Sequence, residues 1–123
     1  MTKKIILSAA APAPIGPYSQ AVQIDNVLYV SGQIALSTFE AGASIEEETD
    51  QVMKNIDAVL TEAGFTFDHV VKCSIFVKNM NDFAAINGVY GQYFTENPPA
   101  RETVEVARLP KDVRVEISCI AHK

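Results

Sequence analysis

The stretch Ser44–Gly64 reads SIEEETDQVMKNIDAVLTEAG and contains the strongest structural signal in the chain. Ser44 and Glu47 match a capping box, and the acidic residues 46–48 suit the positive end of a helix dipole. Gly64 is a natural helix stop. Apolar residues recur between these ends at helical spacing, namely Val52, Ile56, Val59, Leu60 and Ala63. The stretch therefore predicts an amphipathic helix that buries one face.

Segments of alternating polarity on either side of this helix predict strands. They are Tyr18–Ile24, Val27–Leu36, His69–Lys78, Thr103–Leu109 and Val113–Ala121. The first two join at Asp25-Asn26, which suits a tight turn. The last two are joined by a short Pro-Lys-Asp turn and predict an antiparallel hairpin. In His69–Lys78 the pattern predicts one shared face for Val71, Cys73, Ile75 and Val77.

A second helix is expected from about Asn81 to a point before Pro98, with a stripe made by Phe83, Ile86, Tyr90 and Phe94. The order is then β-β-α-β-α-β-β, with a small N-terminal strand as an option. Two helices cover one face of such a sheet, so we predict a single two-layer α+β domain over residues 1–123. The other face would carry apolar residues such as Val30, Val70 and Phe76, which predicts a homo-oligomer that buries them.

Composition excludes several function classes. The 123 residues are 48% hydrophobic and 20% charged, which is ordinary for one globular domain. A net charge of −5 and a pI near 4.9 provide no general attraction to nucleic-acid phosphates or anionic membranes. No apolar run approaches the ~20 residues that span a bilayer. The N-terminal MTKKIILSAAAPAP is too short in its apolar part for a signal peptide, so we expect a cytoplasmic protein.

The cysteines and histidines do not predict a metal site. Cys73 and Cys119 each fall on the apolar side of an alternating pattern, so we expect buried free thiols. The chain has no C-x-x-C motif. His69 stands at a helix-to-strand junction and His122 is next to last, so neither completes a plausible zinc ligand set.

The polar side of the predicted hairpin holds the candidate site. The stiff segment 98–100, Pro-Pro-Ala, delivers Arg101 to the mouth of a strand. Directly opposed residues of antiparallel strands share a face, which groups Arg101, Thr103, Glu105, Arg114, Glu116 and Ser118. A Glu105–Arg114 ion pair is expected there, which leaves Arg101, Thr103 and Glu116 as a possible cluster. The pattern alone slightly favours a plain Arg101–Glu116 pair on a solvated face.

Four sequence motifs favour a functional site over a plain ion pair. IGPYSQA at 15–21, YVSGQI at 29–34, PPAR at 98–101 and VEVARLPKDVRVEI at 104–117 resemble, in order and spacing, those of the Rid family, formerly YjgF and often labelled an endoribonuclease. The resemblance runs from about Pro14 to Ala121 and is closest to the RidA branch. It implies a chorismate-mutase-like fold assembled as a homotrimer with three clefts between subunits.

The resemblance also implies an activity and site residues. RidA proteins hydrolyse reactive 2-imino and enamine acids, such as 2-iminobutanoate and 2-iminopropanoate, to 2-keto acids and ammonia without a cofactor. It implies that Arg101 clamps the substrate carboxylate and Glu116 positions the water. The positions that would line the cleft are Tyr18, Ser31, Gly32, Asn87 and Thr103, with Tyr18 reaching in from a neighbouring subunit. The chain departs from the family at Thr103, where cysteine is frequent, and in a shorter loop after Ile34.

Two other function classes stay open. A non-catalytic sensor of small keto acids would also use Arg101, although retention of Glu116 favours chemistry. A translation-inhibiting endoribonuclease would need a basic binding surface and a histidine pair. The lysines at 3, 4, 54, 72, 78 and 111 are scattered and no histidine pair is evident, so nucleic acid is not an expected partner.

Overall fold

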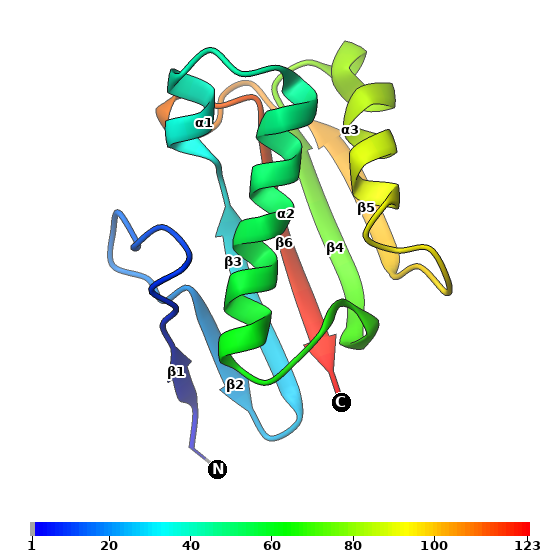
Figure 1. The fold of residues 1–123 in the computed structure, drawn as a ribbon. Coiled ribbons are helices and arrows are strands. Elements are labelled where there is room, and N and C mark those ends of the chain that lie inside the picture. Colours follow the sequence, from blue (N-terminus) through cyan, green and yellow to red (C-terminus); the bar gives the residue numbers. More distant parts are fainter. Residues whose placement is uncertain (1) are drawn as a thin grey trace.

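The computed structural model describes residues 2–123 and contains, over that range, one six-stranded sheet with helices packed on one face (Figure 1). The strand order across the sheet is β1-β2-β3-β6-β4-β5. The strands are β1 (Lys4–Ile6), β2 (Ala21–Ile24), β3 (Val27–Gln33), β4 (Val70–Val77), β5 (Ala100–Glu105) and β6 (Val115–His122). The helices are α1 (Leu36–Glu40), α2 (Ile45–Glu62) and α3 (Phe83–Gly91), with short 3-10 turns η1 (Phe67–His69), η2 (Met80–Asp82) and η3 (Pro110–Asp112). The predicted two-layer α+β class is confirmed.

Helix α2 forms as its sequence predicts. The Ser44 hydroxyl accepts a hydrogen bond from the Glu47 backbone N–H at 3.1 Å, and a Glu47 carboxylate oxygen accepts one from the Ser44 backbone N–H at 3.3 Å. This reciprocal cap satisfies groups that a helix end otherwise leaves free. The helix ends at Glu62, just before the left-handed Gly64 (φ +80°).

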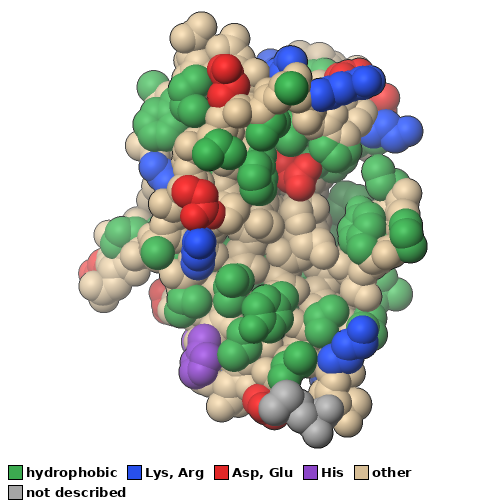
Figure 2. Space-filling view, turned by 180° about the vertical axis from the view of Figure 1, so that it is seen from behind, with side chains coloured by type: hydrophobic (Ala, Val, Ile, Leu, Met, Phe, Trp, Pro, Cys, Tyr) green, Lys and Arg blue, Asp and Glu red, His purple; other side chains and the backbone are tan. Residues whose placement is uncertain are grey.

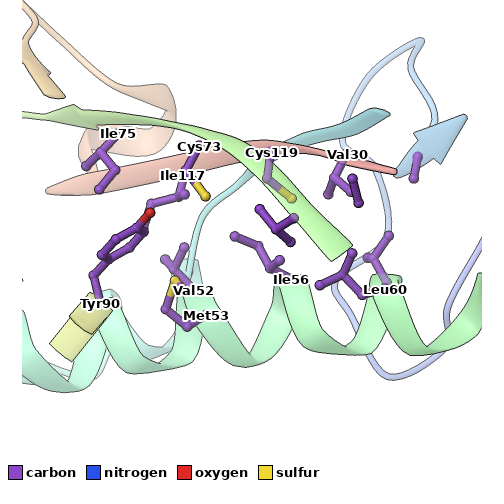
Figure 3. Close-up of a cluster of buried hydrophobic side chains, with 14 of the residues drawn as sticks. Val30, Val52, Met53, Ile56, Leu60, Cys73, Ile75, Tyr90, Ile117 and Cys119 are labelled. Atoms are coloured by element: carbon purple, nitrogen blue, oxygen red, sulfur yellow. The ribbon is translucent and has the colours of Figure 1, made fainter. Parts of the chain in front are cut away.

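The hydrophobic core lies between α2 and the helix-facing side of the sheet (Figure 3). Val52, Met53 and Ile56 of α2 are buried against strand residues, which include Val30, Cys73, Ile75, Ile117 and Cys119. Both cysteines are free and buried, as expected. In the part of the chain that the structure describes, no helix combines the length and apolar character needed to cross a membrane.

The predicted C-terminal hairpin is wrong. Strand β6 pairs antiparallel with β3 and β4, near the middle of the sheet, whereas β5 pairs parallel with β4 at the sheet edge. The physical reason is burial: Val115, Ile117 and Ala121 of β6 are fully buried, while β5 is largely exposed. A strand with a fully apolar face gains most from a central place, and a polar strand suits an edge.

The predicted Glu105–Arg114 ion pair is also absent from residues 2–123. The Arg114 Nε donates instead to the buried Glu48 carboxylate of α2 at 2.7 Å, and the Arg114 backbone N–H donates to the same group at 2.9 Å. Glu105 accepts a hydrogen bond from the Met80 backbone N–H at 2.8 Å. Arg114 therefore ties the start of β6 to the first turns of α2.

The sheet face away from the helices is mixed rather than fully apolar, because Lys72, Glu102 and Glu116 lie on it beside apolar residues, and its apolar members differ from those predicted. Val30 and Val70 are instead buried on the helix side. Val30 is in register with the buried Cys119 of β6, and a bulge between Val70 and Lys72 inverts the alternation at the start of β4. The same bulge leaves Val71 49% exposed rather than in the core. Phe76 does lie on the open face, which also carries the exposed residues Ile5, Tyr29 and Val104. Figure 2 shows hydrophobic side chains spread over this side of the molecule among charged ones.

Two short elements extend the predicted order. The optional N-terminal strand is present as β1, paired with β2 at the sheet edge. The segment after β3, expected to be a loop, contains the five-residue helix α1.

Candidate functional site

Arg101 lies on β5 and its guanidinium is held by α3. Its carbon Cζ lies 5.0 Å from the ring centroid of Tyr90 and 5.6 Å from that of Phe83, distances suited to cation–π contacts. Its Nη1 donates a hydrogen bond to Asn87 Oδ1 at 2.6 Å. These three partners stand at positions i, i+4 and i+7 of α3, so one helix face presents them together. We call Arg101, Phe83, Asn87 and Tyr90 the arginine cluster.

The Arg101 guanidinium is held in place but has no anionic partner in the part of the chain that the structure describes. Among residues 2–123 no carboxylate lies within ion-pairing distance of Arg101, so the predicted Arg101–Glu116 pair on a solvated face is wrong. Arg101 is exposed, and it borders a concave surface formed with Asn87, Gly91, Pro98 and Pro99. Such a group is available to bind an anion from solution or from another molecule.

One hydroxyl of the arginine cluster and one hydroxyl of β5 are buried. Tyr90 Oη and Thr103 Oγ1 are buried without a hydrogen-bond partner among the described residues. Figure 3 shows the Tyr90 ring reaching from α3 toward the sheet, near Cys73. Burial raises the pKa of Tyr90 and of the Cys73 thiol, so both groups stay neutral near pH 7. Thr103 is in register with the buried Ile75 of β4, so its side chain lies on the helix side of the sheet.

Glu116 occupies a separate concave surface. Its lining residues are Ile15, Tyr18, Ser31, Gly32, Ile34, Pro110 and Glu116, and we call this set the glutamate concavity. Glu116 is half-buried, and burial raises the pKa of its carboxyl. It has no ion-pair partner in residues 2–123. A carboxylate in this state is a candidate proton acceptor.

The sequence around Gly32 shapes the concavity. The register of β3 against β6 shifts between Val30 and Gln33, which marks a bulge at Ser31-Gly32 beside Glu116. A Cβ atom at position 32 would overlap the Glu116 carboxylate, so glycine lets the carboxylate lie against the β3 backbone and a larger residue would displace it. The Ser31 hydroxyl donates to the Ser19 backbone carbonyl at 2.6 Å, which makes it an anchor of the loop and not a free nucleophile.

Tyr18 forms the exposed wall of the glutamate concavity. Its side chain is 48% exposed, and its Oη accepts a hydrogen bond from the Ile15 backbone N–H at 3.4 Å. The loop behind it is tied down by the buried Gln20. The Gln20 Oε1 accepts from the Ser8 N–H at 2.6 Å, and its Nε2 donates to the Pro12 carbonyl at 2.9 Å.

The predicted site residues thus form two groups on opposite faces of the sheet. Arg101 is opposite Cys73, on the helix side, whereas Glu116 is opposite Phe76, on the open side. The prediction that Arg101, Thr103 and Glu116 share a face within one chain is wrong, because it depended on the hairpin. Asn87 joins the arginine cluster, while Tyr18, Ser31 and Gly32 join Glu116.

Sequence reasoning missed three contributors. The helical spacing predicts Phe83 and Tyr90 as core stripe residues, yet both rings also contact the Arg101 guanidinium. The i, i+4, i+7 spacing of Phe83, Asn87 and Tyr90 is the sequence signal that places the three side chains on one helix face. Pro110, which the sequence predicts only as part of a turn, also lines the glutamate concavity.

Comparisons with known proteins agree along nearly the whole chain. The family profile described as Endoribonuclease L-PSP matches residues 8–123. A RutC family protein from Synechocystis sp. is 54% identical over 126 residues, which cover 98% of this chain and 97% of the relative. The crystal structure of E. coli TdcF with bound serine is similar with a TM-score of 0.91 and 39% identity, covering 98% of each chain. RidA from an Antarctic Psychrobacter sp. is similar with a TM-score of 0.90 and 36% identity, covering 98% of this chain and 99% of that one.

Proposed function

The chain belongs to the endoribonuclease L-PSP family, also called the Rid or YjgF family, and we propose that it is an imine deaminase. In this proposal it hydrolyses reactive 2-imino acids and their enamine forms, such as 2-iminobutanoate and 2-iminopropanoate. Water adds to the C=N carbon, the C–N bond breaks, and the products are a 2-keto acid and ammonia.

The observation that carries the proposal is the Arg101 guanidinium, which is held in place but has no carboxylate partner among residues 2–123. Two ring contacts and the Asn87 hydrogen bond fix its plane, which leaves further N–H groups available to a ligand. A planar guanidinium binds a carboxylate through two parallel hydrogen bonds and so sets its orientation. A 2-imino acid has its carboxylate next to the reacting carbon. The serine bound in the TdcF structure, at 39% identity, is likewise a small amino acid with a carboxylate.

Glu116 supplies the second function that hydrolysis requires. A carboxylate can accept a proton from the attacking water, and its partial burial tunes its pKa upward toward neutral pH. Free imines already hydrolyse in water, so orientation of a water and the imine carbon is sufficient to accelerate the reaction. In this mechanism neither a stronger nucleophile nor a cofactor is needed.

The two groups must come from different subunits. Because Arg101 and Glu116 leave opposite faces of one sheet, a single chain cannot place both on one small substrate. The open face, on which the apolar residues Tyr29 and Val104 are exposed, is the surface that we assign to a second copy. We place the active site in the cleft where the arginine cluster of one subunit meets the glutamate concavity of the next, in a closed homotrimer.

The test is a reaction with a pyridoxal-phosphate threonine dehydratase, which releases 2-iminobutanoate. Without a trap, added protein should speed the release of 2-ketobutanoate; with semicarbazide, it should lower the yield of imine-derived semicarbazone. Binding of a keto acid with no change in 2-ketobutanoate release or in semicarbazone yield would favour a non-catalytic sensor. Because the family name refers to an endoribonuclease, the same preparation should also be assayed for cleavage of single-stranded RNA, where we expect none.

A further inference from the structure

An apolar cavity adjoins the glutamate concavity at the end of β3. It is lined by Pro12, Ala13, Pro14, Ile15, Tyr18, Gln20, Gly32, Gln33, Ile34, Leu36 and Ser37. In Figure 1 these residues belong to the loop that precedes β2, to the end of β3 and to the start of α1. We call it the side-chain pocket. Given the proposed deaminase function, we infer that this pocket receives the side chain of the 2-imino acid. It selects substrates whose side chain is apolar, uncharged and larger than the methyl group of the alanine imine.

Continuity with the reacting centre is the first support. The side-chain pocket and the glutamate concavity share four residues, namely Ile15, Tyr18, Gly32 and Ile34. An imine carbon is planar and carries three groups: the carboxylate, the nitrogen and the side chain. With the carboxylate on Arg101 of one subunit and the carbon beside Glu116 of the next, the third group points away from both. The adjoining pocket is where it can go.

The chemistry of the lining is the second support. None of the pocket residues is charged, and most are apolar. The amide of Gln20 is already engaged, with its Oε1 on the Ser8 N–H and its Nε2 on the Ser8 and Pro12 carbonyls. The Gln33 Nε2 donates to the Ser31 carbonyl at 3.2 Å. A carboxylate or ammonium on the substrate side chain would therefore lose its water without gaining a charged partner, which is costly.

One part of the pocket wall comes from helix α1. Leu36 and Ser37 begin α1, which follows β3 after Ile34 and Ala35. Leu36 lines the side-chain pocket but not the glutamate concavity. A change at Leu36 should therefore alter the room for the substrate side chain without touching the residues around Glu116.

The test compares imines that differ only in their side chain. A flavin amino-acid oxidase with catalase produces the imines of alanine, norleucine and glutamate, and semicarbazide trapping reports how fast the protein removes each. For the natural chain we expect kcat/KM for the norleucine imine to equal or exceed that for the alanine imine. The glutamate imine should be at least about tenfold slower.

The decisive variant is Leu36→Trp, which fills the side-chain pocket. It should lower kcat/KM for the norleucine imine about tenfold or more while changing that for the alanine imine less than threefold or so. Leu36→Lys should narrow the gap between the glutamate and norleucine imines, because it adds a cation to the wall. The matched control is Phe39→Trp, on the same short helix, because Phe39 faces the Arg114 guanidinium at 5.6 Å and does not line the pocket.

The outcomes separate this inference from the deaminase proposal. If the natural chain accelerates none of the imines, the deaminase proposal fails. A second outcome is that the natural chain accelerates the imines while Leu36→Trp and Phe39→Trp show the same ratio of kcat/KM for the norleucine and alanine imines. In that case the deaminase proposal holds and the assignment of the side-chain pocket is wrong. A folded state for each variant is checked by its melting temperature, and Leu36→Ala, which only enlarges the pocket, repeats the test should the tryptophan not fit.

Discussion

The side chains of Arg101 and Glu116 leave the same sheet on opposite faces, because Arg101 is in register with Cys73 and Glu116 with Phe76. Residues 73 and 76 are an odd number of positions apart on β4, and successive side chains of a strand alternate between faces. One copy of the chain therefore presents two separate halves of the proposed site. The proposed reaction therefore requires an oligomer, in which two subunits complete one site.

Mixing two inactive variants should restore activity. Arg101→Ala and Glu116→Gln each remove one half of the proposed active site, so either variant alone should be nearly inactive. If both are denatured together and refolded at equal amounts, random assembly of trimers leaves about a quarter of the clefts with both natural residues. We expect kcat per subunit to recover to about that fraction. Light scattering coupled to size exclusion should give a trimer mass; a monomer, or no recovery on mixing, contradicts the shared cleft.

Arg101→Lys should be nearly as damaging as Arg101→Ala. Lysine keeps the charge but loses the planar fork, the Asn87 hydrogen-bond geometry and the stacking on Tyr90. Loss of a charge-assisted pair costs about 1.5–3 kcal/mol, which is roughly ten- to a hundredfold in kcat/KM. Because Arg101 is exposed, the melting temperature should change little. A lysine variant with near-normal turnover would mean that only charge matters at this position.

Glu116→Gln should abolish most activity yet not destabilise the fold. Loss of a general base costs about a hundredfold or more in kcat/KM. Burial raises the pKa of the Glu116 carboxyl above 4.5, so the ionised form costs stability. That cost is absent below the unfolded pKa and develops as pH rises through the folded one. At pH 7 the glutamine variant should therefore melt at the same or a higher temperature, and the difference should vanish in acid.

The pH dependence of kcat/KM for the natural chain should report the ionisation of Glu116. Because the proton acceptor must be the carboxylate, kcat/KM should fall as pH drops through the raised pKa of Glu116. The acid limb of the profile is then expected above 4.5. A flat profile down to that value contradicts a role for Glu116 as the base.

Thr103 should tolerate substitution. Its Oγ1 is buried without a hydrogen-bond partner among residues 2–123, so the hydroxyl contributes a desolvation cost and no bond. Thr103→Val, which keeps the shape, should leave or raise the melting temperature. Thr103→Cys and Thr103→Ala should retain most deaminase activity. A loss of about a hundredfold in Thr103→Ala, with Thr103→Val equally affected, would assign a direct role to the hydroxyl.

Local patterns in the sequence were sufficient for several features. The capping box at Ser44 and the stripe through Val52 and Ile56 specify α2, because a helix is built from contacts three or four residues apart. The motifs around Tyr18 and Arg101 indicated the family, which the comparisons confirm. Each of these signals is short in range and is complete within one segment.

Only the tertiary structure decided which strands are neighbours. Alternation in β5 shows which of its residues share a face, but it does not show whether β4 or β6 lies beside it. The connection through α3 makes β5 parallel to β4, and the fully apolar face of Ile117 and Cys119 draws β6 to the centre. That pairing set Arg101 against α3 and away from Glu116. The partition of the site depends on contacts between residues distant in sequence, and those contacts are determined by burial of the whole sheet.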